Sequence, residues 1–82
     1  MTNPEVMTKL TMERILLETI ENESPQLWNQ MAMWPEKEQE AFVQEQVRVA
    51  TRVQDQLKNA GLGAGQLSEM VRSVLLEYPD AN

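Results

Sequence analysis

Eighty-two residues with a net charge of −6, no cysteine and no histidine leave few ways to stabilise a fold or to carry chemistry. The length suits one domain with a small core, which neither disulfides nor a histidine- or cysteine-based zinc site can reinforce, so tight helix packing and oligomerisation remain. Residues 1–47 carry nine acids and three bases (−6) and residues 48–82 carry four of each, so the acidic half repels nucleic-acid phosphates and anionic membranes.

The first predicted helix covers about residues 4–22. Pro4 fits its first turn, where the missing N–H costs nothing. Its apolar residues point in several directions, and Ile15, Leu16 and Leu17 make one turn apolar nearly all round, which is typical of a helix buried on more than one side. Because a bundle of this size can hardly surround one of its own helices, we expect this turn to need a second molecule.

A short second helix is predicted at about residues 25–33, within the segment SPQLWNQMAMWP that holds both tryptophans. Ser24 suits the N-cap position, and Pro25 suits the first turn. Pro35 disfavours a helical conformation for the preceding Trp34, so the helix is expected to end there.

The third predicted helix is the long one, over about residues 35–60, or roughly 38 Å at 1.5 Å per residue. Glutamates fill its first turns, and Gly61 suits the left-handed position that follows a helix end. Gln46 lies within its apolar stripe, where it either reaches water near one end or makes an interhelical hydrogen bond that fixes the register. The stripe consists of Phe42, Val43, Val47, Ala50, Val53, Leu57 and Ala60.

The fourth predicted helix covers about residues 66–77, and its apolar residues recur at the spacing of one helical stripe. Leu76 falls outside this stripe and is expected to face away from it. The short linker at residues 61–65 favours an antiparallel pair with the long helix. The sequence therefore predicts a single domain (1–82), an all-α bundle of three or four helices. In the antiparallel pair we expect Phe42, Val53 and Leu57 to pack against Leu67, Val71 and Val74.

No residue pattern indicates catalysis or cofactor binding. General acid–base and nucleophilic chemistry usually uses His, Cys, or Ser beside a base, and the first two are missing. Transition-metal sites usually use His or Cys, and no stretch has the spaced oxygen ligands of a calcium loop. The glycines of AGLGAGQL are not followed by the Lys-Ser/Thr of a phosphate loop. We expect no enzyme activity, no cofactor and no metal.

Residues 63–78, GAGQLSEMVRSVLLEY, resemble the second helix of ribbon-helix-helix DNA-binding repressors, in which a small-residue turn leads into a similar Ser-Glu-X-Val-Arg-X-X-Leu pattern. The resemblance implies that VRVATRV, residues 47–53, forms the DNA-reading strand. Too few residues separate that segment from Gly61 to hold the family's first helix, and the acidic first half opposes DNA binding. A repressor is therefore the third functional alternative.

The tryptophan segment either closes one end of the core or forms a surface for a partner. Tryptophan is favoured at interface hot spots, and methionine packs adaptably. Since the small core also favours association, we expect a protein-binding adaptor, accessory subunit or regulator, as a homodimer or with a larger protein. The main alternative is an acidic inhibitor of a nucleic-acid-binding protein. The expected contact residues are Ile15, Leu27, Trp28, Met31, Trp34 and Leu76.

The sequence also bears on location. The first residues, MTNPEVMTKLTMER, have neither the basic start nor the continuous apolar stretch of a signal peptide. No apolar run approaches the roughly 20 residues that span a bilayer. We therefore expect a cytoplasmic protein that binds neither membranes nor nucleic acid.

Overall fold

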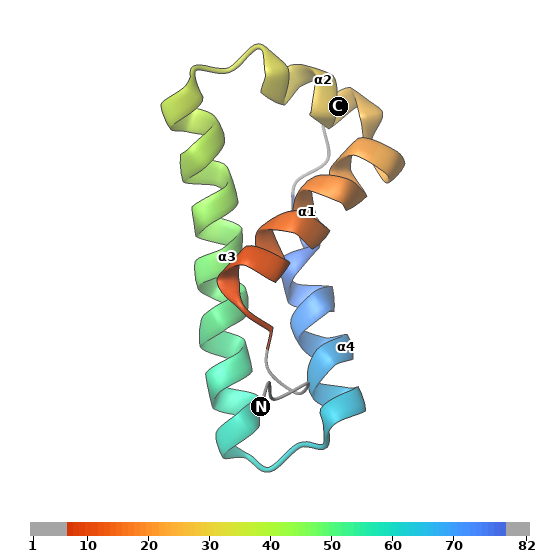
Figure 1. Cartoon of the computed structure of the whole chain (residues 1–82), viewed down its shortest axis with the longest axis vertical. Coiled ribbons are helices and arrows are strands. Elements are labelled where there is room, and N and C mark those ends of the chain that lie inside the picture. Colours follow the sequence, from red (N-terminus) through yellow and green to blue (C-terminus); the bar gives the residue numbers. More distant parts are fainter. Residues whose placement is uncertain (1–6, 79–82) are drawn as a thin grey trace.

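The computed structural model describes residues 7–78 as four helices joined by short connections (Figure 1). No strand occurs among these residues, so the all-α prediction is confirmed. The segment at residues 47–53, which a ribbon-helix-helix repressor needs as a strand, is helical. The helices are α1 (Lys9–Glu23), α2 (Pro25–Ala32), α3 (Glu36–Asn59) and α4 (Ala64–Leu75).

The start of α1 differs from the prediction. Residue 4 lies outside the described residues, but Met7 and Thr8 are not helical, so a continuous helix over 4–22 is wrong at its beginning. Thr8 has an extended backbone, and its hydroxyl accepts a hydrogen bond from the Thr11 N–H at 3.1 Å. A threonine side chain that satisfies a free N–H of the first turn starts a helix at the next residue.

The end of α3 follows the prediction closely. Gly61 has a φ of +83°, which a residue with a side chain rarely adopts. Its N–H donates to the Lys58 carbonyl at 3.1 Å, and the Leu62 N–H donates to the Leu57 carbonyl at 3.3 Å. These two bonds form the turn that commonly ends a helix at glycine. The turn sends the chain back, so that α4 runs antiparallel to α3 and packs along it (Figure 1).

The centre of the core comes from α1, which packs against α2, α3 and α4. Met12, Leu16 and Ile20 recur at four-residue intervals, so they share one face of the helix, and none of them has exposed surface. Leu10, two residues before Met12, points away from this face and is 76% exposed. The other buried apolar residues are Leu27, Met31, Val47, Ala50, Leu67, Val71 and Leu75.

Two expectations about surplus apolar surface are wrong. The turn at residues 15–17 is covered within one chain: Leu16 is buried, and Ile15 and Leu17 are half-buried against the core. The reason is that α1 has helix neighbours on several sides. Leu76 is also half-buried against the core, because α4 ends at Leu75 and helical spacing does not determine the direction of the next side chain.

The pair of α3 and α4 is antiparallel as predicted, with a partly different set of deep residues. On α4, Leu75 is buried where Val74 was the expected residue, so Leu75 completes the four-residue spacing of Leu67 and Val71. On α3, Val53 is only half-buried. The deepest residues of α3 are Val47, Ala50 and Gln54.

Glutamine side chains connect α3 to the segments beside it. The Gln54 amide accepts from the Met7 N–H at 2.8 Å and donates to the Met7 carbonyl at 3.1 Å, so it pairs with the chain before α1. Gln46 donates to the carbonyls of Leu75 and Glu77 at 3.1 and 2.9 Å. The interhelical interpretation of Gln46 is therefore confirmed, because its bonds join α3 to the end of α4.

A pair of matched leucine substitutions on α1 tests this core. Leu16→Ala should lower the free energy of unfolding by about 2–5 kcal/mol, because it removes a fully buried side chain. Leu10→Ala removes the same atoms from an exposed site and should change it by less than about 0.5 kcal/mol. Urea denaturation followed by circular dichroism measures both. Equal losses would mean that α1 does not present the Met12–Leu16–Ile20 face to the core.

Candidate functional site

A groove of about 600 Å³ opens between α1, α2 and the first half of α3. Its apolar lining includes Leu17 from α1, Trp28 from α2 and Val43 from α3. Two glutamates, Glu13 and Glu40, are the only charged residues that line it. We call this feature the Trp28 groove. It is lined by Glu13, Leu17, Trp28, Met31, Ala32, Gln39, Glu40, Val43 and Gln44.

The turn at Ser24 places Trp28 in this groove. The Ser24 N–H donates to the Ile20 carbonyl at the end of α1, and its own carbonyl accepts from the Trp28 N–H at the start of α2. Ser24 thus holds the predicted cap position of α2, but its hydroxyl makes no capping bond. That hydroxyl pairs instead with the Tyr78 hydroxyl at 2.8 Å, which joins the turn to the segment after α4.

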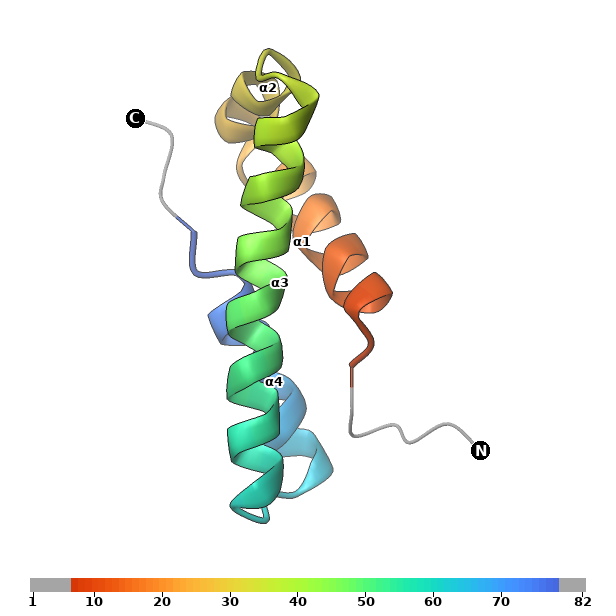
Figure 2. The ribbon, with the colours of Figure 1, turned by 90° about the vertical axis from the view of Figure 1, so that its left-hand side faces the viewer.

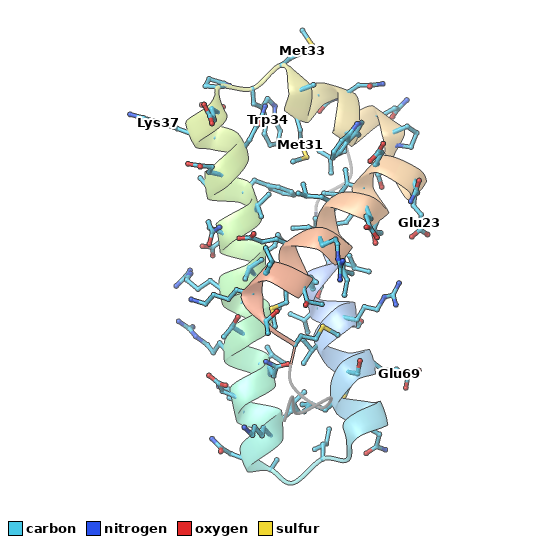
Figure 3. All side chains as sticks on the ribbon, viewed as in Figure 1. Glu23, Met31, Met33, Trp34, Lys37 and Glu69 are labelled. Atoms are coloured by element: carbon cyan, nitrogen blue, oxygen red, sulfur yellow. The ribbon has the colours of Figure 1, made fainter. Side chains whose placement is uncertain are left out.

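Gln39 of α3 fixes the other end of α2. Its amide donates to the Met31 carbonyl at 2.6 Å and to the Trp34 carbonyl at 3.1 Å. Carbonyls at a helix end lack partners within the helix, so this side chain satisfies groups that would otherwise need water. Figure 3 shows Met31, at the end of α2, and Trp34, in the connection to α3, pointing inward. Met33 of the same connection points outward and is 86% exposed.

The two tryptophans have different surroundings. The Trp34 ring meets the Phe42 ring edge-on, with centroids 5.8 Å apart, and Phe42 meets Tyr78 in the same manner at 6.5 Å. Such edge-to-face pairs are a favourable arrangement of aromatic rings. Trp34 is therefore held by intramolecular contacts, and Trp28 is the tryptophan that lines the groove.

The charge of the groove-lining residues changes from negative to mainly positive at Gln44. Its amide donates to the Glu13 carboxylate at 2.8 Å, which links α3 to α1. A second groove of about 420 Å³, the basic groove, shares Gln44 with the first and is lined by three cations and one acid. Its lining residues are Lys9, Gln44, Val47, Arg48, Thr51, Arg52 and Asp55.

Arg48 also forms an exposed ion pair with Glu45, at 2.7 Å. The hydrogen bond and the charge of the Arg48 guanidinium hold the pKa of the Glu45 carboxyl below its ordinary value. Both side chains are more than half exposed, so the pair contributes little to stability. It does hold the guanidinium in one position.

The structure brings together only part of the predicted contact set. Trp28 and Met31 both line the groove, although Met31 is only 5% exposed. Leu27 is 4% exposed and belongs to the core, so it offers almost no surface to a partner. The predicted residues outside the groove and half-buried against the core are Ile15, Trp34 and Leu76.

Seven of the nine lining residues were not among the expected contacts, and four of them give the groove its apolar and charged character. Leu17 and Val43 are apolar residues at spacings that predict a core position, and no sequence signal distinguishes a groove floor from a core. Glu13 and Glu40 are ordinary helix-surface glutamates in sequence. Only the crossing of α1 and α3 brings these two acids to the same groove.

Within residues 7–78, no group of three acidic, histidine or cysteine side chains could hold a metal ion. Every buried side-chain nitrogen and oxygen in this part of the chain has a hydrogen-bond partner. None of its helices combines the length and apolar character that a bilayer crossing requires. Comparison with protein-family models, with curated proteins and with solved structures finds no match for this chain.

Loss of the Gln39 side chain tests what holds the groove in shape. Gln39→Ala should lower the free energy of unfolding by about 1–3 kcal/mol, because the Trp34 carbonyl loses the bond from Gln39 and the Met31 carbonyl keeps only its bond from the Trp34 N–H. Gln56→Ala, at an exposed position of the same helix, is the matched control and should be close to neutral. Urea denaturation followed by tryptophan emission measures the difference. Identical midpoints for the two variants would contradict this role of Gln39.

Proposed function

We propose that this protein acts by binding a protein segment in the Trp28 groove, as an adaptor or regulator. The observation that supports this function is a half-buried tryptophan among apolar residues, in a groove whose only charged residues are glutamates. Tryptophan is the residue type most enriched among interface residues that dominate binding energy. Met31 beside it supplies a flexible side chain that packs against differently shaped partners.

The chemistry of the groove selects the class of partner. An apolar side chain of the partner would cover Leu17, Trp28 and Val43. Lysine or arginine beside it would meet Glu13 and Glu40, because complementary charges at the rim of an interface favour the correct partner and its orientation. The proposed partner is therefore a basic amphipathic segment.

The polar groups of the groove favour a protein segment over a small molecule. Small-molecule sites usually hold a few polar groups that point at the ligand and fix its orientation. Here the Gln39 amide already donates to two backbone carbonyls, and the Gln44 amide donates to Glu13. The apolar surface of the groove and the charges of Glu13 and Glu40 remain available to a ligand. A long amphipathic segment can contact both.

A peptide titration tests this function. The probe is an 18-residue peptide with leucines on one helical face and lysines on the other, compared with the same peptide carrying glutamates. In a Trp34→Phe background, Trp28 is the only tryptophan and reports binding by its emission. The lysine peptide should bind and shift the emission to shorter wavelength, and the glutamate peptide should bind at least about tenfold more weakly.

Two variants connect the binding to the groove. Trp28→Ala, followed by peptide anisotropy, should weaken binding about 30-fold, which corresponds to about 2 kcal/mol for a hot-spot residue. Glu13→Gln with Glu40→Gln should reduce the preference for the lysine peptide. Circular dichroism checks that the helices persist. Equal affinity for both peptides, or binding unaffected by Trp28→Ala, would show that the groove is not the binding site.

A further inference from the structure

A row of residues ordered by charge winds along the surface of α3. Glu36, Glu40, Gln44, Arg48 and Arg52 follow at four-residue intervals, so they form a continuous ridge on the helix, and all five are exposed. We call this row the charge ridge. In chain order, its side chains are two acids, one amide and two bases. In the view of Figure 2, no other described helix passes in front of α3.

The stability of a single helix does not account for this order. Like charges four residues apart destabilise a helix, and the ridge contains two such pairs, Glu36 with Glu40 and Arg48 with Arg52. The helix dipole favours an acid in the first turn and a base in the last turn only. It therefore accounts for Glu36 but not for the two arginines, which lie well before the end of α3.

The order of charges along the ridge is complementary to its own reverse. Two copies of α3 that meet antiparallel therefore place acids near bases. With a twofold axis at Gln44, residues equally distant from Gln44 face each other. Glu40 and Arg48 lie only about 40° of helix rotation on either side of Gln44, so Glu40 meets Arg48 of the second copy when the two helices cross along their rows. Glu36 and Arg52 are turned about 80° away and flank this contact. The two Gln44 amides meet at the axis. Each donates one hydrogen to Glu13 of its own chain, and its second hydrogen can be donated to the amide oxygen of the other copy.

We propose that the partner of this face is a second copy of the chain, and that the charge ridge sets the antiparallel register of the homodimer. This inference rests on the proposed function, because Glu40 and Gln44 of the ridge also line the Trp28 groove. The twofold axis brings the basic groove of one copy opposite the glutamates of the other. The second copy thus brings Arg48 to the glutamates beside the Trp28 groove, as the proposed binding mode calls for.

The geometry of Arg48 suits this contact. Its Nε and Nη2 atoms donate to Glu45 at distances of 2.7–3.2 Å, which holds the guanidinium in place. Nη1 makes no hydrogen bond to any described residue and can donate to Glu40 of the second copy. Exposed ion pairs contribute little affinity each, so the ridge determines orientation and the apolar residues of the groove provide most of the affinity.

Charge reversal tests the register. Glu40→Arg and Arg48→Glu each place like charges opposite each other twice in a homodimer, and each should weaken self-association at least about tenfold at low salt. Mixed in equal amounts, the two variants should form a heterodimer, since each reversed residue then faces its opposite. The double variant Glu40→Arg/Arg48→Glu should recover the homodimer with no change in net charge. Sedimentation velocity at about 20 mM and about 500 mM NaCl measures all four, and the higher salt should weaken the dimer.

Control variants on α4 separate the register from net charge. Glu69→Arg and Arg72→Glu change the charge by the same amounts at exposed positions away from the ridge, and neither should alter association (Figure 3). A monomer at high micromolar concentration, equal effects of the control variants, or no rescue in the mixture would overturn the proposal. The lysine peptide then distinguishes the two hypotheses: if it still binds at Trp28, only the dimer is wrong, and if it does not, the protein-binding groove is wrong as well.

Discussion

Three glutamine side chains of α3 determine where the other segments of the described chain lie. Gln39 holds the end of α2, Gln46 holds the end of α4, and Gln54 pairs with the backbone of Met7 before α1. In each case the amide bonds backbone groups that no regular helix can satisfy, because helix ends and connecting segments leave N–H and C=O groups without partners. Apolar burial alone would let these segments slide along α3, whereas directed bonds fix one position for each.

The groove follows from these fixed positions. Gln54 sets where the chain enters α1, and the Ser24 turn sets where it leaves, so the Met12–Leu16–Ile20 face is buried among the other helices. Gln39 holds the end of α2 against the beginning of α3, and the groove opens between these helices and α1. Trp28 and Trp34 lie six residues apart but have different neighbours, because Trp28 lines the groove and Trp34 packs against Phe42.

The sequence predicts the features that depend on local geometry. Helical spacing and Gly61 place α3 at Glu36–Asn59 against a predicted 35–60, and the short linker predicts the antiparallel α4. It does not predict features that depend on which backbone group a side chain finds: the Thr8 cap, the Ser24–Tyr78 bond and the bonds of Gln39 and Gln54. For Gln46 it offers an interhelical bond as one of two interpretations, without the partner. Nor does it distinguish a groove floor from a core. The four-residue repeat of the charge ridge is readable from sequence, but its meaning depends on which side of α3 the other helices leave exposed.

Most of the apolar residues are covered by other parts of the same chain, and this changes the physical basis of the association that we propose. The residues that suggest a surplus in sequence are covered within one chain, and the large apolar residues that remain exposed, Leu10, Met33, Val49 and Met70, come from four different parts of the fold. In the binding mode that we propose, the charges along α3 and around the Trp28 groove therefore select the partner. Charge complementarity raises association rates and specificity more than it raises affinity, and salt screens it. Contacts of this kind form and dissociate readily, which is compatible with the adaptor or regulator role that we propose.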